Sequence, residues 1–120
     1  IGLQAEHEDP WLARSAKTYL RGAPGSARLA FALQQRARLM SLAEVFQMEF
    51  IAVLGTLAYG DIQEGIRALL IDKDKQPTWQ PATLAEADDA WVQKFFELPW
   101  PEGTVGPLAD LGAPRAQASA

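Results

Sequence analysis

The sequence predicts an all-α fold with about five helices. Capping patterns, in which Ser, Asp or Thr precedes Glu by three positions, start segments at 41, 61 and 83. Apolar residues in these segments recur at intervals of three and four, and no segment alternates as a strand does. We therefore expect a helical unit over residues 1–102. A mobile tail rich in Gly, Pro and Ala is expected over residues 103–120.

The first two helices are predicted on either side of a Pro/Gly turn. Asp9 is the expected N-cap of the first, and Pro10 suits a first turn, where a missing N–H does no harm. Gly22 and the Pro-Gly pair that follows it end this helix. Ser26 is then the expected N-cap of the second helix, which runs to about Leu39.

The third helix starts after Ser41 and ends at Tyr59-Gly60, and it has the broadest apolar face. We expect it to be the central and most buried helix. The fourth starts after Asp61, with the inward side formed by Ile62, Ile66, Leu69 and Leu70. Gly65 within it costs about 1 kcal/mol relative to Ala, which indicates the close approach of another backbone. A loop over 72–81 then leads to a fifth helix, which is predicted over 83–98.

Composition is that of a soluble globular protein. The chain has 120 residues, 48% of them apolar and 22% charged, and no cysteine, which fits a reducing compartment and excludes thiolate chemistry. We count no apolar run of the roughly 18 residues that cross a bilayer and no secretory signal, so no membrane partner is expected. The first residue is Ile rather than Met, from which we expect a processed product or an excised fragment.

Charge is divided along the chain. Residues 10–40 contain six basic residues and no acid, whereas from residue 41 onward twelve acids face five basic residues. One interpretation is a basic face for the phosphates of CoA or nucleic acid. The other is two helical layers of opposite charge that face water or each other. The basic residues are sparse and lack interleaved aromatic residues, so we expect no nucleic-acid partner.

Few residues are candidates for chemistry. His7 lies beside three acids, but neighbours before a helix rarely converge on one ion and no second His or Cys completes a zinc set, so no metal is predicted. Glu49 interrupts an apolar stripe and is either a carboxylate of raised pKa or one that reaches an arginine or water. Trp79 and Trp100 lie in Pro-flanked loops, and we expect them to pack on the helices or on a missing neighbour.

The segment DIQEGIRALLIDKDKQPTWQP over 61–81 resembles the C-terminal region of the crotonase (enoyl-CoA hydratase/isomerase) superfamily. The order Glu-Gly, basic, Ala, apolar pair, Ile-Asp-Lys-Asp and Pro-x-Trp is closest to the 3-hydroxyisobutyryl-CoA hydrolase branch. SLAEVFQMEF over 41–50 also matches, and the resemblance covers about residues 6–98. It implies the helical part of a spiral β/α fold, whose other members are about three times longer than this chain.

The resemblance implies an acyl-CoA thioester hydrolase of valine breakdown, with CoA as part of the substrate and no other cofactor. The catalytic residues and the oxyanion hole would lie in a crotonase core that precedes this region, so we expect none here and no activity from the chain alone. Its role would be to complete the fold and wall the acyl-CoA pocket. The alternatives are a segment of an enoyl-CoA hydratase or isomerase and a stand-alone helical protein-interaction module.

The resemblance also implies further expectations about binding and location. Lys73 follows the Glu-Gly helix in the turn that commonly lies near the CoA phosphates, with Lys75 and Arg67 as weaker candidates. Hydratases have Glu-Lys-Arg in this turn, whereas Asp72 and Asp74 introduce acids here, which would also suit a structural turn. Homo-oligomer contacts through the C-terminal helices are expected. The location would be the bacterial cytoplasm or the mitochondrial matrix of a eukaryote.

Overall fold

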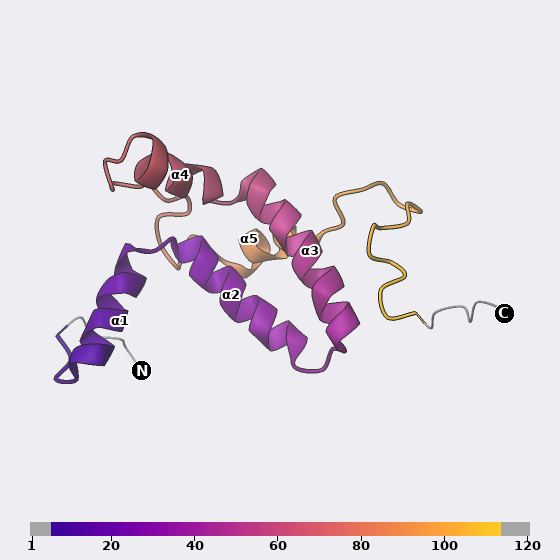
Figure 1. The fold of residues 1–120 in the computed structure, drawn as a ribbon, viewed down its shortest axis with the longest axis horizontal. Coiled ribbons are helices and arrows are strands. Elements are labelled where there is room, and N and C mark those ends of the chain that lie inside the picture. Colours follow the sequence, from indigo (N-terminus) through magenta and orange to yellow (C-terminus); the bar gives the residue numbers. More distant parts are fainter. Residues whose placement is uncertain (1–5, 114–120) are drawn as a thin grey trace, which may run out of the picture.

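The computed structural model describes residues 6–113, which form helices and loops and contain no strand. The helices are α1 (Pro10–Arg21), α2 (Pro24–Ala37), α3 (Leu42–Tyr59), α4 (Ile62–Ile66) and α5 (Asp89–Gln93). A π-helical turn, Arg67–Ile71, continues α4, and a 3₁₀ turn, Lys94–Phe96, continues α5. The predicted all-α class with five helices is confirmed. Figure 1 shows α2 and α3 diverging from the loop that joins them, with α5 between them. In this view α1 and α4 lie on the left, and the C-terminal part of the described chain lies on the right.

The N-terminal caps were predicted well for two helices. The Asp9 carboxylate accepts the Trp11 N–H at 2.8 Å, and Ser41 and Glu44 form a full capping box. The predicted start of α2 is wrong by three residues, because the N-cap is Ala23 and not Ser26, and the helix begins at Pro24. Proline at the first helical position has its φ already set for the helix. Ser26 therefore lies inside the first turn.

The predicted fifth helix over 83–98 is wrong as a single element. The Thr83 hydroxyl does accept the Glu86 N–H at 3.2 Å, but the turn that it starts ends within a few residues. Asp88 then starts a new helix, since its backbone is extended and its carboxylate accepts the Trp91 N–H at 2.8 Å. An aspartate with this backbone favours an N-cap over a helix interior.

The core is small and centres on Phe95, which is 1% exposed. Its ring meets Trp91 at a centroid distance of 4.5 Å and Tyr59 edge-on at 6.4 Å. Gly55 of α3 lies against it, because a Cβ built there would be 3.0 Å from Phe95 Cα. Arg28 ties α2 to the same region by donating to the Ala87 carbonyl at 3.0 Å. This core joins α2, α3 and α5.

Among the described helices α3 has the most buried residues, as predicted, but much of its apolar face is exposed. Met48, Ala52 and Gly55 are buried, whereas Phe46 is 50% and Leu57 is 51% exposed. Periodicity identified an apolar surface but not how much of it this chain covers. By length and composition alone, α3 is also apolar enough to cross a membrane, contrary to the prediction that no apolar run is long enough, which took Gln47, Glu49 and Gly55 as interruptions. The core helix of a soluble protein passes the same test.

The chain is extended rather than compact. Its radius of gyration is 18.4 Å and its extents are 64 × 32 × 30 Å, whereas a globular chain of this length has a radius of about 14 Å. Part of the predicted tail has defined contacts: Gln47 of α3 donates to the Leu108 carbonyl at 2.7 Å. Its mobility stays a prediction, and residues 114–120 lie outside the described range.

Candidate binding site at the Arg67 turn

Arg67, the first residue of the π-helical turn, is at the centre of an ionic cluster. Its Nε and Nη2 donate to the two oxygens of Glu64 at 2.8 and 2.7 Å. Its Nη1 donates to Asp72 at 2.6 Å and to Asp74 at 2.7 Å, and Nη2 also reaches the Gln76 carbonyl at 3.3 Å. The planar, five-donor guanidinium suits this fork geometry. One arginine thus joins α4 to the loop that follows.

The same carboxylates also bind backbone groups of the loop. Glu64 Oε1 accepts the Thr78 N–H at 2.7 Å, and Asp74 Oδ1 accepts the Gln76 N–H at 2.8 Å. Asp61 accepts the Gln80 N–H at 2.9 Å and makes no side-chain cap for α4, so its predicted capping role is wrong. The loop is therefore fixed by acids of α4 and its own acids.

The hydrogen bonds set the protonation of the cluster. Those from Arg67, followed by the Thr78 N–H, lower the pKa of Glu64 from 4.5 to about 2. The Arg67 side chain and the Gln76 N–H likewise lower the pKa of Asp74, while the carboxylates raise the pKa of Arg67. Hydrogen bonds to a charged form favour that form. Glu64, Asp74 and Arg67 are therefore ionised at neutral pH.

Lys73 and Lys75 alternate with the acids and have a different environment. Both have backbones in the left-handed region, with φ of 55° and 58°, which residues other than Gly, Asn and Asp rarely adopt. Both residues are exposed, and within residues 6–113 neither ammonium forms an ion pair. The Arg67 cluster and these two lysines outside it together have a net charge of zero (−3 + 1 + 2).

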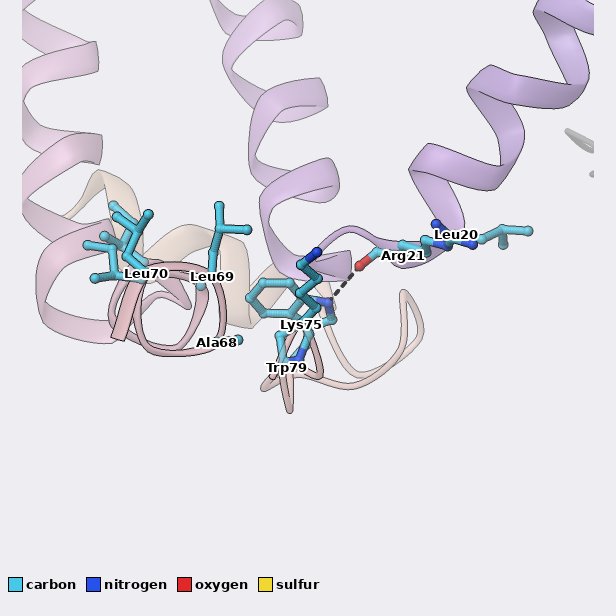
Figure 2. Close-up of a pocket in the computed structure, with 11 residues that line it drawn as sticks. Leu20, Arg21, Ala68, Leu69, Leu70, Lys75 and Trp79 are labelled. Carbon is cyan, nitrogen blue, oxygen red and sulfur yellow. Dashed lines mark hydrogen bonds between the residues drawn. The ribbon is translucent and has the colours of Figure 1, made fainter. Parts of the chain in front are cut away.

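An open hollow of about 920 Å³ adjoins this turn. Figure 2 shows Trp79 beside Lys75, with the hydrogen bond from the indole N–H to the Arg21 carbonyl, which measures 3.0 Å. The lining is mainly apolar and comes from the end of α1, from α4 with its π-helical turn, and from the loop: Leu20, Arg21, Ile62, Gly65, Ile66, Ala68, Leu69, Leu70, Lys75, Pro77 and Trp79. An apolar hollow with a cation at its edge is typical of a site for an anionic organic ligand.

The neighbours of Gly65 and of the α4 side chains differ from prediction. A Cβ at Gly65 would lie 3.5 Å from the Trp79 ring, so its neighbour is a side chain and not a backbone. The prediction that four apolar residues face inward is wrong as well, since each is at least 40% exposed: Ile62, Ile66, Leu69 and Leu70. Their periodicity is real, but no described residue covers them fully.

The other predicted candidates lie away from this turn. Glu49 is exposed and forms no ion pair within residues 6–113, which favours the interpretation that it reaches water. His7 accepts the Asp9 N–H at 3.0 Å as part of a turn. Within the same residues, no group of three potential ligands could hold a metal ion. Trp79 packs on the helices as expected, against Gly65 of α4 and Arg21 of α1, whereas Trp100 contacts Gly106 in the loop that follows it.

The two helical layers of opposite charge meet at α2 and α5. Arg28 pairs with Asp89 at 3.2 Å, and Arg36 donates to Gln93 at 2.8 Å while its guanidinium lies 3.7 Å from the centre of the Phe96 ring. These contacts favour the interpretation that the basic helices face acidic ones.

The sequence suggested a structural turn for Asp72 and Asp74, but the pairing of these acids and Glu64 with Arg67 was missed. The spacing of Glu64 and Arg67, three positions apart, is a known helical pairing and could have signalled it. No comparable signal exists for Asp72 and Asp74, because they reach Arg67 only after the chain has left the helix.

Comparison with known proteins identifies the family. The model of the enoyl-CoA hydratase/isomerase family matches residues 2–96. The mitochondrial 3-hydroxyisobutyryl-CoA hydrolase of Danio rerio is 40% identical over 83 residues, which cover 69% of this chain and 22% of that protein. The protein of the same name from Dictyostelium discoideum is 35% identical over 96 residues, or 79% of this chain and 25% of that protein. The chain spans about a quarter of the length of these relatives. It belongs to the enoyl-CoA hydratase/isomerase family.

Proposed function

We propose that this chain is the helical C-terminal segment of an acyl-CoA thioester hydrolase that acts on 3-hydroxyisobutyryl-CoA in valine breakdown. The similarity to 3-hydroxyisobutyryl-CoA hydrolases over most of this chain supports the proposal. In this role the segment completes the fold, walls the acyl-CoA pocket and supplies no catalytic residue. Because several relatives are named mitochondrial, the matrix is the proposed location in a eukaryote.

The uncovered apolar surface supports a role in completing a larger fold. Leu69 and Leu70 are 61% and 62% exposed, and Ile71 beside them is 69% exposed. Burying one such side chain contributes about 1.5–3 kcal/mol. We propose that a preceding crotonase core covers this surface and that the oxyanion hole and the acidic catalytic group lie in that core.

Lys73 and Lys75 are the proposed contacts for the CoA phosphates. An ammonium is a compact point charge that suits a phosphate oxygen, and both lysines are exposed and outside the Arg67 cluster. Arg67 is not retained as a phosphate ligand, since its guanidinium already donates to three carboxylates.

The first test concerns the chain alone. Mixed with 3-hydroxyisobutyryl-CoA and a thiol reagent, it is expected to release no CoA above background, because the catalytic groups are proposed to lie elsewhere. An antibody against the chain is expected to detect a native species about three times its size. Sustained turnover by the chain would contradict the proposal that the catalytic groups lie elsewhere. A native species no larger than the chain would contradict the proposed longer enzyme and favour a stand-alone interaction module.

The second test concerns the lysines in the enzyme that carries this segment. The double variant Lys73→Gln/Lys75→Gln is expected to raise KM for the CoA thioester about tenfold, equivalent to about 1.4 kcal/mol, with kcat unchanged. Lys94→Gln, an exposed lysine on the 3₁₀ turn, is the matched control and should leave KM unchanged. Turnover of an enoyl-CoA instead of the hydroxyacyl thioester would favour the hydratase or isomerase alternative.

A further inference from the structure

We propose that Arg67 is a positioning residue, which gathers the acids of its turn and thereby leaves Lys73 and Lys75 available for the phosphates of a CoA thioester. The inference rests on the proposed function. It also gives the acids in the turn an effect opposite to that of their charge alone: they assist the binding of an anion, although each is an anion itself.

The geometry of the turn supports this role. Asp72 and Asp74 flank Lys73, and both bond the same nitrogen, Arg67 Nη1, at 2.6 and 2.7 Å. The intervening residue is therefore held between two fixed points, with a φ of 55°. Anchoring the acids on both sides therefore restricts the conformations that are open to Lys73.

Lys75 is held by a second pair of contacts. Its N–H donates to the Ala68 carbonyl at 3.0 Å, and the preceding Asp74 accepts the Gln76 N–H at 2.8 Å. The residue has a φ of 58° and lines the hollow with Trp79. A lysine rarely adopts this backbone region without such contacts, so loss of the anchors is expected to move its side chain.

The acids are also kept away from the lysines. Carboxylates adjacent in sequence would otherwise be the nearest partners for Lys73 and Lys75 and would compete with a phosphate. Instead both aspartates pair with Arg67, and within residues 6–113 neither lysine forms an ion pair. This explains how a turn with interleaved acids can still present positive charge.

The test is Asp74→Ala in the enzyme that carries this segment. The charge of Asp74 and its role as an anchor predict opposite changes in KM. Loss of a negative charge near a phosphate site would lower KM. Loss of an anchor is expected to raise KM for 3-hydroxyisobutyryl-CoA about fivefold, with kcat unchanged. The N-acetylcysteamine thioester of the same acid has no phosphate, so its kcat/KM should not change. Asp89→Ala removes another exposed, arginine-paired carboxylate and should leave both substrates unaffected.

Each outcome decides between the proposals. A lower or unchanged KM in Asp74→Ala, while Lys73→Gln/Lys75→Gln raises it, overturns the positioning role alone. If KM is also unchanged in Lys73→Gln/Lys75→Gln, the lysines have no phosphate role, and this inference is overturned as well. If Asp74→Ala lowers activity equally on both thioesters, Arg67→Lys decides, since it retains the charge but not the fork. A KM effect confined to the CoA thioester supports the inference, and an equal loss on both substrates overturns it.

Discussion

Glu64 shows how one residue can control a loop through its protonation. Its carboxylate accepts two hydrogen bonds from Arg67 and one from the Thr78 N–H, and its pKa is lowered from 4.5 to about 2. An acid whose pKa is lower in the folded than in the unfolded state stabilises the folded state at any pH above its unfolded pKa. This stabilisation is lost as the pH falls through the pKa of the folded state. The loop should therefore remain anchored at pH 4.5 and loosen toward pH 2.

The Thr78 amide tests this directly. Its NMR chemical shift is expected to stay constant from neutral pH to about 3 and then to change with a midpoint near 2, the pKa of its acceptor. In Glu64→Gln the change should be absent, because an amide does not titrate there. A midpoint close to the ordinary value of 4.5 in the unmodified protein would contradict the anchoring.

Gly55 and Gly65 form a second pair of predictions at this scale. A Cβ at Gly55 would lie 3.0 Å from the backbone of Phe95, whereas one at Gly65 would lie 3.5 Å from the Trp79 ring. Alanine gains about 1 kcal/mol of helix propensity at either position, but overpacking costs about 1–3 kcal/mol. Gly55→Ala should thus lower the free energy of unfolding, whereas Gly65→Ala should raise it by up to about 1 kcal/mol. Urea titration measures both, and a stabilising Gly55→Ala would contradict the packing.

At the scale of helices and turns, the sequence predicted best where a local side chain makes the signal. The Ser41–Glu44 capping box and the Asp9 cap depend on residues two or three positions apart, and both are present. Only half of the predicted Thr83 box is present, since the Thr83 hydroxyl accepts the Glu86 N–H but the Glu86 carboxylate accepts the Ala82 N–H. The second cap at Asp88 was missed because this residue lies within the helix predicted over 83–98. The contact of Trp79 with Arg21 joins positions 58 apart, and no local pattern encodes it.

Asp88 has an energetic consequence for the core. Its carboxylate caps the short α5 by accepting the Trp91 N–H. This helix and the 3₁₀ turn that continues it bring Trp91 and Phe95 into contact. Asp88→Ala is expected to lower the free energy of unfolding by about 1 kcal/mol. Asp89→Ala, which removes an exposed ion pair with Arg28, should cost less than about 1 kcal/mol. Equal effects in thermal unfolding would show that Asp88 acts through charge and not as a cap.

At the scale of the whole molecule, the extended shape and the exposed apolar residues share one explanation. In the part of the chain that the structure describes, eight buried apolar residues form the core, and most of them are small, whereas many large ones are exposed on α3, α4 and the π-helical turn. Periodicity predicts that these faces are apolar, but a chain that spans about a quarter of its relatives does not carry the surface proposed to cover them. The sequence therefore predicted correctly which side of α4 is apolar, but the prediction that this side is buried within the chain was wrong.

Leu70 gives the test of this explanation. It is 62% exposed here, so Leu70→Asp should change the helicity and stability of the chain alone by no more than about 0.5 kcal/mol. In the longer enzyme, where we propose that a core covers this side chain, the same change should cost about 2–5 kcal/mol. Leu70→Met retains volume and apolar character and should be tolerated in both within about 1.5 kcal/mol. Circular dichroism and denaturant titration compare the two proteins, and equal small effects of Leu70→Asp in both would mean that this surface stays in water.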